Sequence, residues 1–224
     1  MSKKYAVIGL GSFGSSAARA LAHMGVEVIA IDRNRERVEA IKDAVSTAVI
    51  VDASDEKAIQ AQELQDCAGV ILALGDKLGE NVLVLSTLQS LGVRRVVVQV
   101  GHQTERRIML KLGASDVVVP SEDAGQTLAQ KVLLEGVREA LPMGNGYFMA
   151  TLLVPAEFVG KTLVELRPRE RFHLNVVALF SEEVSSDARR LVCRGEVSPK
   201  HEFHPNDFIG VFGKEEAVRR ILEL

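Results

Sequence analysis

The chain has 224 residues, of which 47% are hydrophobic, 25% are charged and 4% are aromatic, and it contains no Trp. This composition is typical of a folded globular protein, and the length favours one domain of ordinary size with a smaller second one. The formal net charge is -3 and the Lys and Arg residues are scattered, which argues against a nucleic-acid-binding protein because such proteins carry a basic stripe for phosphate contacts.

The first 120 residues alternate between short apolar runs and helical patterns. The runs are almost continuously apolar, as strands buried on both faces should be. The predicted strands are Tyr5–Leu10, Val26–Ile31, Ala48–Val51, Gly69–Leu74, Val96–Val100 and Asp116–Val119. The predicted helices are Phe13–Met24, Arg35–Asp43, Glu56–Leu64, Glu80–Leu91 and Glu105–Leu112. Strict alternation of this kind indicates an α/β fold, a Rossmann-like doubly wound parallel sheet of six strands.

Single residues mark several of the expected helix ends. Gly25, Gly92 and Gly113 each follow a helical pattern, so we expect them to be C-caps. Asp55 and Thr104 precede helical patterns and are expected N-caps.

The pattern changes after residue 121. A longer helical segment is expected over Glu122–Leu141, ended by Pro142 and followed by a turn. Further strands are predicted at Tyr147–Val154, Leu174–Phe180, Leu191–Arg194 and Phe208–Phe212, with helices at Thr162–Leu166 and Glu215–Leu224. We therefore expect a Rossmann-like domain over residues 1–121, a crossover helix and linker over 122–146, and a small α+β domain over 147–224. A domain that small is marginally stable alone, so we expect it to pack against a second copy.

A glycine-rich turn follows the first predicted strand. Gly9-Leu10-Gly11-Ser12-Phe13-Gly14 has the pattern G-x-G-x-x-G and leads into a predicted helix. Gly9 permits the tight turn, Gly11 lets a pyrophosphate approach the backbone, and Gly14 allows close packing of helix and strand. Ser12 and Phe13 lie where the free N–H groups and the dipole of the helix attract phosphate.

An acidic residue closes the second predicted strand. Asp32 lies 18 residues beyond Gly14, where a carboxylate accepts hydrogen bonds from ribose hydroxyls and disfavours a 2′-phosphate. Arg33 beside it weakens that exclusion. The alternative is that the glycines serve packing alone and Asp32 caps a helix. The context favours an adenine nucleotide, namely NAD(H), ADP or ATP, with NADP least favoured.

Two further strand ends are expected at the same edge of the sheet. Asp52-Ala53 closes the third strand and Ala73-Leu74-Gly75 closes the fourth, and ligands of open parallel sheets bind at such ends. Asp52 could bind the adenine amino group or could cap the helix that begins at Glu56. The sequence leaves both interpretations open.

The sequence contains no recognisable reaction centre. His102 follows the fifth strand, but no acidic or basic partner accompanies it. Tyr147 lacks the lysine four positions later that short-chain reductases use, and there is no Gly-x-Ser-x-Gly elbow or Walker lysine. His201, His204 and Asp207 could hold a metal, although a Pro-flanked turn is the simpler interpretation. We therefore expect neither catalysis nor a metal.

Cys67 and Cys193 are far apart, as expected for free thiols in a reducing cytosol. No signal peptide precedes Tyr5, and no apolar stretch approaches the ~20 residues that span a bilayer. We expect a soluble, cytoplasmic chain that acts at a membrane only through a partner.

Several segments together resemble the cytosolic regulators of Trk- and Ktr-type potassium uptake systems, also called RCK proteins. These segments are Tyr5–Ser15, Asp32, Val51–Glu56, Leu110–Asp116, Val119-Pro120 with Gly125, Val159–Leu166 and Pro205–Gly213. The resemblance covers essentially the whole chain. It implies binding of ATP, ADP or NAD(H) at the glycine turn, homodimers often assembled into octameric rings, and an integral-membrane potassium transporter subunit that the nucleotide opens or closes.

Two other functions are compatible with the same fold. The interpretation as an NAD-dependent oxidoreductase rests on the Rossmann turn alone, and this turn does not by itself imply a function. A nucleotide-sensing module with a different partner is the third. Full-length resemblance and the missing reaction centre favour regulation of potassium transport.

The sequence differs from the family pattern at three positions where relatives carry a charged residue. Ktr relatives commonly have Arg where Ser12 stands and Lys or Arg where Gln99 stands, both near the nucleotide. A Glu that can hold a cation at the dimer interface is replaced by Ser121, with Glu122 one residue later. Charge-assisted hydrogen bonds are roughly twice as strong as neutral ones, so we expect poor discrimination of ATP from ADP and a preference for NAD(H) or another adenosine ligand.

The predicted crossover helix also carries apolar residues on one face. Leu128, Val132 and Leu133 fall at helical spacing. This face could join copies of the chain or could pack on its own domain, and the sequence leaves both open.

Overall fold

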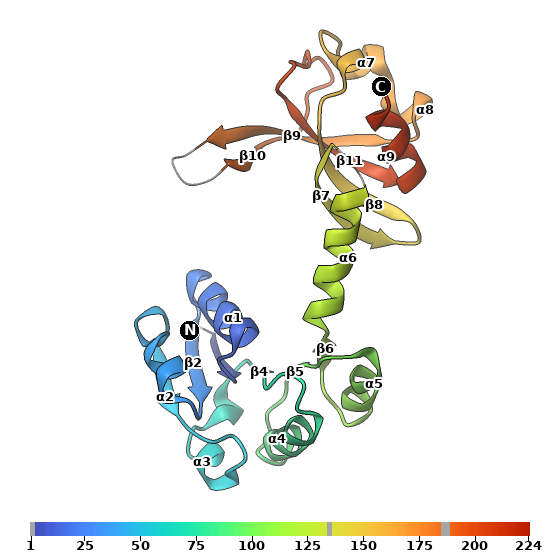
Figure 1. The fold of residues 1–224 in the computed structure, drawn as a ribbon. Helices are drawn as coiled ribbons and strands as arrows, with labels where there is room; N and C mark the ends of the chain where they lie inside the picture. The colour runs from blue at the N-terminus through green and yellow to red at the C-terminus, as the bar shows by residue number, and fades with distance from the viewer. Residues whose placement is uncertain (1–2, 134–135, 185–188) are drawn as a thin grey trace. The chain divides into compact units, whose positions relative to one another are not determined.

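The computed structural model describes residues 3–133, 136–184 and 189–224. The chain forms two compact units, one that ends at Asp123 and one that begins at Ala124 (Figure 1).

The first unit is built on a parallel sheet. In the described residues it has six strands in the order β3-β2-β1-β4-β5-β6. The strands are β1 Lys4–Ile8, β2 Glu27–Asp32, β3 Thr47–Ile50, β4 Gly69–Leu72, β5 Val96–Gln99 and β6 Asp116–Val118. The strand order reverses between β1 and β4. This topology confirms the predicted Rossmann-like fold.

Helices cover both faces of this sheet. They are α1 Ser12–His23, α2 Arg35–Glu39, α3 Glu56–Gln60, α4 Leu78–Ser90 and α5 Gln103–Lys111, with the 3-10 helices η1 Lys42–Ala44 and η2 Leu64–Asp66. Alternate residues of β1 point to opposite faces: Val7 packs in a core with α1 and α2, and Ile8 in a core with α3, α4 and α5. Burial on both faces explains why the strands are so continuously apolar.

Two predicted helices are shorter than expected. α2 ends at Glu39 and α3 at Gln60, and a 3-10 helix follows each. After α3, Glu63 adopts a left-handed conformation with φ of 52°, which a continuing helix cannot contain.

Most predicted caps are found in the structure. The three expected C-cap glycines have positive φ, at 79° for Gly25, 80° for Gly92 and 92° for Gly113. The Asp55 side chain accepts the N–H of Ala58, as an N-cap should. The prediction for Thr104 is wrong. α5 begins at Gln103 with His102 as its N-cap, and the carboxylate of Glu105 accepts the Gly101 N–H at 3.0 Å.

The predicted helix over Glu122–Leu141 is wrong from Gly136 onward. α6 spans Pro120–Leu133, and residues Val137–Gly144 form strand β7. Gly136 has φ of 91°, and pairing of β7 with β8 buries Val137 and Ala140. Residues 142–146, expected to be a linker, therefore lie in a hairpin of the second unit.

The position of β7 in the sheet explains how this strand can contain Pro142. β7 is an edge strand, where a missing N–H is tolerated. Asn145 and Gly146, with φ of 52° and 75°, form the two-residue turn into β8.

The second unit is α+β, as predicted. Its described residues contain an antiparallel sheet in the order β10-β9-β11-β8-β7. The other strands are β8 Tyr147–Leu153, β9 Asn175–Val184, β10 Arg189–Gly195 and β11 Phe208–Lys214. The helices are η3 Ala156–Phe158, α7 Leu163–Leu166, α8 Pro168–Arg171 and α9 Glu215–Leu222. Phe158, Phe203 and Ile221 lie at the centre of its core, fully buried.

Candidate functional site

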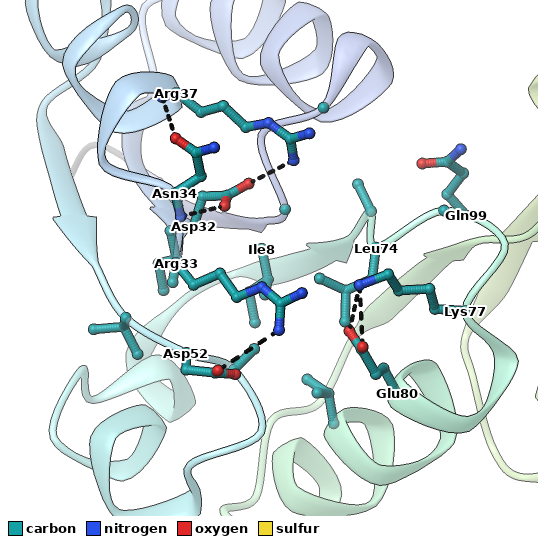
Figure 2. Close-up of a pocket in the computed structure, with 18 of the residues that line it drawn as sticks. Ile8, Asp32, Arg33, Asn34, Arg37, Asp52, Leu74, Lys77, Glu80 and Gln99 are labelled. Atoms are coloured by element: carbon teal, nitrogen blue, oxygen red, sulfur yellow. Dashed lines mark hydrogen bonds and ion pairs between the residues drawn. The ribbon is translucent and has the colours of Figure 1, made fainter.

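A cavity of about 420 Å³ lies at the carboxyl ends of the parallel strands (Figure 2). Its wall takes residues from the ends of β1, β2, β4 and β5 and from the segment after β3. Strand order reverses here between β1 and β4, which is where open α/β sheets bind ligands. The volume is in the range of small-molecule sites.

The glycine-rich turn forms one wall of this cavity. Gly9 has φ of 92°, and a Cβ there would meet the carbonyl of Ala73. A Cβ at Gly14 would meet the carbonyl of Gly9, so both glycines are needed for close packing. Gly11 differs because no atom lies within 4 Å of an added Cβ. Its backbone borders the open cavity and is accessible to a ligand.

The first turn of α1 has the features of an anion site. Gly11 is its N-cap, and no side chain caps the helix in the described chain. The N–H groups that begin a helix have no intrahelical partner, and the helix dipole places partial positive charge there. Ser12 and Phe13 line the cavity at this point. The geometry fits a phosphate group.

Asp32 is held firmly by the protein itself. Its side chain is 5% exposed, and Oδ2 accepts the Leu10 N–H at 2.6 Å and contacts Arg37 Nη1 at 3.4 Å. Oδ1 accepts the Asn34 N–H at 2.8 Å. A carboxylate accepts about four hydrogen bonds, so these three contacts leave room for one from a ribose hydroxyl. The alternative role of Asp32 as a helix cap is wrong, because Asn34 caps α2 by accepting the N–H groups of Glu36 and Arg37.

Asp52 belongs to a polar turn after β3. Its Oδ1 accepts the N–H and the hydroxyl of Ser54 at 3.0 and 2.7 Å, and Oδ2 lies 3.8 Å from Arg33 Nη1. The helix that begins at Glu56 is capped by Asp55, so the capping interpretation of Asp52 is wrong. Ala53 lines the cavity beside it, and contact of Asp52 with an adenine stays a prediction.

These hydrogen bonds keep Asp52 ionised. The N–H and hydroxyl of Ser54, with Arg33 contributing less, hold the pKa of Asp52 below its ordinary value. A lowered carboxyl pKa stabilises the fold above the unfolded-state pKa, and this contribution disappears as pH falls through the folded-state pKa. Ser54→Ala removes the hydroxyl but keeps the N–H, so it should raise the pKa of Asp52 only part of the way to its ordinary value, as measured by NMR titration of the carboxyl carbon. An unchanged pKa would contradict the contribution of the Ser54 hydroxyl, and Arg33→Ala should raise the pKa of Asp52 by less.

The opposite wall comes from the ends of β4 and β5. Ala73, Leu74, Gly75 and Gln99 line the cavity. The buried Asn81 of α4 links the two ends, since its Nδ2 donates to the carbonyls of Gly75 at 3.0 Å and Gln99 at 3.4 Å.

Comparison with known proteins identifies the family. The family model described as the TrkA-N domain matches residues 5–120. The Ktr system potassium uptake protein C of Bacillus subtilis (strain 168) is 31% identical over 179 residues, which cover 80% of this chain and 81% of that protein. The Ktr system potassium uptake protein A of Vibrio alginolyticus is 32% identical over 164 residues, 73% of this chain and 74% of that protein. The chain belongs to the TrkA-N family.

Solved structures share the fold. The GsuK RCK domain matches 100% of this chain and 48% of that chain with a TM-score of 0.65 and 13% identity. The GsuK channel bound to NAD matches 99% of this chain and 40% of that chain, with a TM-score of 0.65 and 14% identity. The chain spans less than half the length of these solved chains. The resemblance of the sequence to RCK-type regulators of potassium uptake is thus confirmed.

The structure of this TrkA-N protein brings the predicted site residues together. All of them except Gly14 line the cavity: Gly9, Gly11, Ser12, Phe13, Asp32, Arg33, Asp52, Ala53, Ala73, Leu74, Gly75 and Gln99. Gly14 lies behind Gly9 and supports the turn. That these residues bind a ligand stays a prediction.

Several residues of the wall were missed by sequence reasoning. They are Ile8, Ile31, Asn34, Arg37, Val51, Ser54, Lys77, Glu80 and Val84. Lys77 and Glu80 carried only a weak signal, because an oppositely charged pair three residues apart shortly after Gly75 is also common on ordinary helix surfaces.

The candidate catalytic and metal residues of this TrkA-N protein lie elsewhere. His102 occupies the N-cap of α5 and is not among the residues that line the cavity. His201 Nε2 lies 3.3 Å from Asp207 Oδ2, while His204 contributes its backbone N–H to the same carboxylate at 2.9 Å. In the described part of the chain no three His, Cys, Asp or Glu side chains are grouped so as to hold a metal ion.

The cysteines and the helices complete the description. Cys193 is exposed, whereas Cys67 is buried and burial raises the pKa of its thiol. Across residues 3–133, 136–184 and 189–224, no helix is long and apolar enough to cross a bilayer.

Proposed function

We propose that this chain is a cytoplasmic, nucleotide-binding regulatory subunit that controls an integral-membrane potassium transporter of the Trk or Ktr type. One observation carries the proposal. The chain matches a Ktr potassium uptake protein over about four fifths of both lengths. It also forms a cavity bordered by the glycine turn, where the N-terminus of α1 has no side-chain cap.

The proposed ligand is an adenine nucleotide, namely NAD(H), ADP or ATP. The open space beside Gly11 and the free N–H groups of α1 suit a phosphate. Asp32 would lie beside the ribose and Asp52 beside the adenine, both supplying acceptors. Residues 1–121 would bind the ligand, and α6 would connect them to the small domain of residues 147–224, which β7 extends.

The nucleotide would act as a signal rather than as a reactant. A ligand shifts a conformational equilibrium only when it binds two states with different affinity. We therefore propose that the nucleotide favours one of two arrangements of the assembled subunits and that the transporter responds to this arrangement.

The proposed partners are other copies of the chain and the transporter subunit. A homodimer is the basic unit, and a ring of dimers is the larger assembly. Leu128 and Val132 lie four residues apart on α6 and are 63% and 68% exposed, which favours contact with a second copy. The side chain of Leu133 lies outside the described residues. Light scattering after gel filtration tests the assembly, and a concentration-independent monomer would contradict it.

Calorimetric titration of the full chain with ATP, ADP, NAD(H) and NADP tests the proposed ligand. We expect adenine nucleotides to bind, and ATP and ADP to differ by less than about tenfold in Kd, a free-energy difference below about 1.4 kcal/mol. No affinity for any of these compounds would contradict the proposal. Oxidation of NADH coupled to reduction of a carbonyl substrate would instead indicate an oxidoreductase.

A further inference from the structure

The charged side chains that line the cavity are arranged in opposite pairs. The pairs are Arg37 with Asp32 at 3.4 Å, Arg33 with Asp52 at 3.8 Å, and Lys77 with Glu80 at 3.0 and 3.2 Å. Formal charges at the wall therefore cancel in the absence of a ligand. Beyond the N–H groups of α1, a ligand with several phosphate charges gains a new ion pair from these side chains only if one of the pairs opens.

The Lys77–Glu80 pair differs from the other two. Asp32 is nearly buried and also accepts the Leu10 N–H, so separating Asp32 from Arg37 would force its other hydrogen bonds to rearrange. Lys77 and Glu80 are 48% and 40% exposed and lie three residues apart where α4 begins. Exposed pairs of this kind contribute little to stability, and a lysine ammonium moves easily on its flexible stem. This pair can exchange partners without disturbing the fold.

Position also distinguishes Lys77. Among the described lining residues from β4, β5, α4 and the segments that join them, Lys77 is the cation, because Ala73, Leu74, Gly75, Val84 and Gln99 are uncharged. Ser12 in the glycine turn is also neutral. Figure 2 shows Lys77 extending past Leu74 toward the space that Arg33 enters from the other side.

We propose that Lys77 determines how strongly binding depends on the phosphate charge of the nucleotide, and that Glu80 offsets this dependence. The inference rests on the proposed function. When Lys77 leaves Glu80 for a phosphate, the freed Glu80 carboxylate repels the same phosphate. Attraction and repulsion largely cancel, which would produce the weak discrimination of ATP from ADP expected above.

The two single substitutions should therefore act in opposite directions. Glu80→Gln removes the repulsion and frees Lys77, so the affinity for ATP relative to AMP should rise by roughly fivefold. Lys77→Met removes the attraction, so that only the repulsion by Glu80 remains. The affinity for ATP relative to AMP should then fall by roughly fivefold. The double variant should return toward the natural protein. High salt should weaken both changes, because exposed charges are screened.

The chain offers a matched control. Glu39 and Lys42 form the same kind of exposed pair three residues apart, at 2.6 Å, and are not among the residues that line the cavity. Glu39→Gln and Lys42→Met should leave the ATP to AMP ratio unchanged. Each variant would be titrated with AMP, ADP and ATP by calorimetry as the full chain, and circular dichroism would verify its fold.

The outcomes separate this inference from the proposed function. If the natural protein binds none of the nucleotides, both are wrong. If it binds them but Glu80→Gln and Lys77→Met shift the ratio by less than about twofold, or in the same direction, the role of Lys77 alone is wrong. Equal shifts in the Glu39 and Lys42 controls would also overturn it, since they would show a general effect of surface charge.

Discussion

Gly14→Ala should destabilise the first unit by about 3 kcal/mol, because the added Cβ would meet the carbonyl of Gly9 and the Cβ of Ala73. The contact with Gly9 is with backbone, which cannot move aside as the end of a side chain can. Alanine favours helix over glycine by about 1 kcal/mol, which offsets only part of the loss. Urea denaturation followed by circular dichroism would measure the change.

Gly11→Ala in the same turn is the matched control. No atom lies within 4 Å of the added Cβ, and Gly11 has an ordinary φ of -64°. Stability should fall by about 1 kcal/mol or less, because alanine is a poorer N-cap residue than glycine but nothing obstructs its Cβ. The methyl group would occupy space beside the cavity, so nucleotide affinity should fall by about tenfold, or 1.4 kcal/mol. Equal stability losses in the two variants would contradict this division of roles.

Asp32→Ala should destabilise the protein by about 3 kcal/mol, because the buried Leu10 N–H loses a charged acceptor at 2.6 Å. The Asn34 N–H and Arg37 lose the same partner. The turn that follows β1 is held by this carboxylate, so nucleotide affinity should fall as well. Chemical denaturation and calorimetry would measure the two effects.

Asp32→Asn provides the comparison for this prediction. An amide oxygen in the place of Oδ2 can still accept from Leu10 and Arg37, but the amide nitrogen in the place of Oδ1 cannot accept the Asn34 N–H. The loss should be about half that of Asp32→Ala. If both substitutions destabilise equally, charge rather than the Leu10 hydrogen bond holds the turn. If neither does, Asp32 serves only the ligand.

The fold of the first unit could be predicted because its strands are buried on both faces. Continuous apolar runs such as Val96–Val98 are typical of such strands, and glycines such as Gly92 mark helix ends clearly. The error from Gly136 onward has a different origin. Val137 and Leu141 lie four residues apart and imitate a helix face, while Asn145-Gly146, a strong hairpin signal, was interpreted as part of a linker.

The candidate site was predicted only where local sequence determines it. The glycine turn and the strand ends are local features. The hydrogen bond from Leu10 to Asp32 is not, because Leu10 is 22 residues away and meets Asp32 only when β1 and β2 pair. Arg37, Lys77 and Glu80 are polar residues on helices or loops, and a sequence alone does not tell a cavity wall from ordinary surface.

Pro142 restricts how the second unit can join other molecules. An edge strand exposes a row of N–H and C=O groups that a foreign strand can extend. β7 forms one edge of its sheet, and Pro142 removes a donor from that row. Addition of a foreign strand along β7 would lack a hydrogen bond there and meet a bulky ring, so copies of this unit should associate through side chains rather than by merging their sheets at this border.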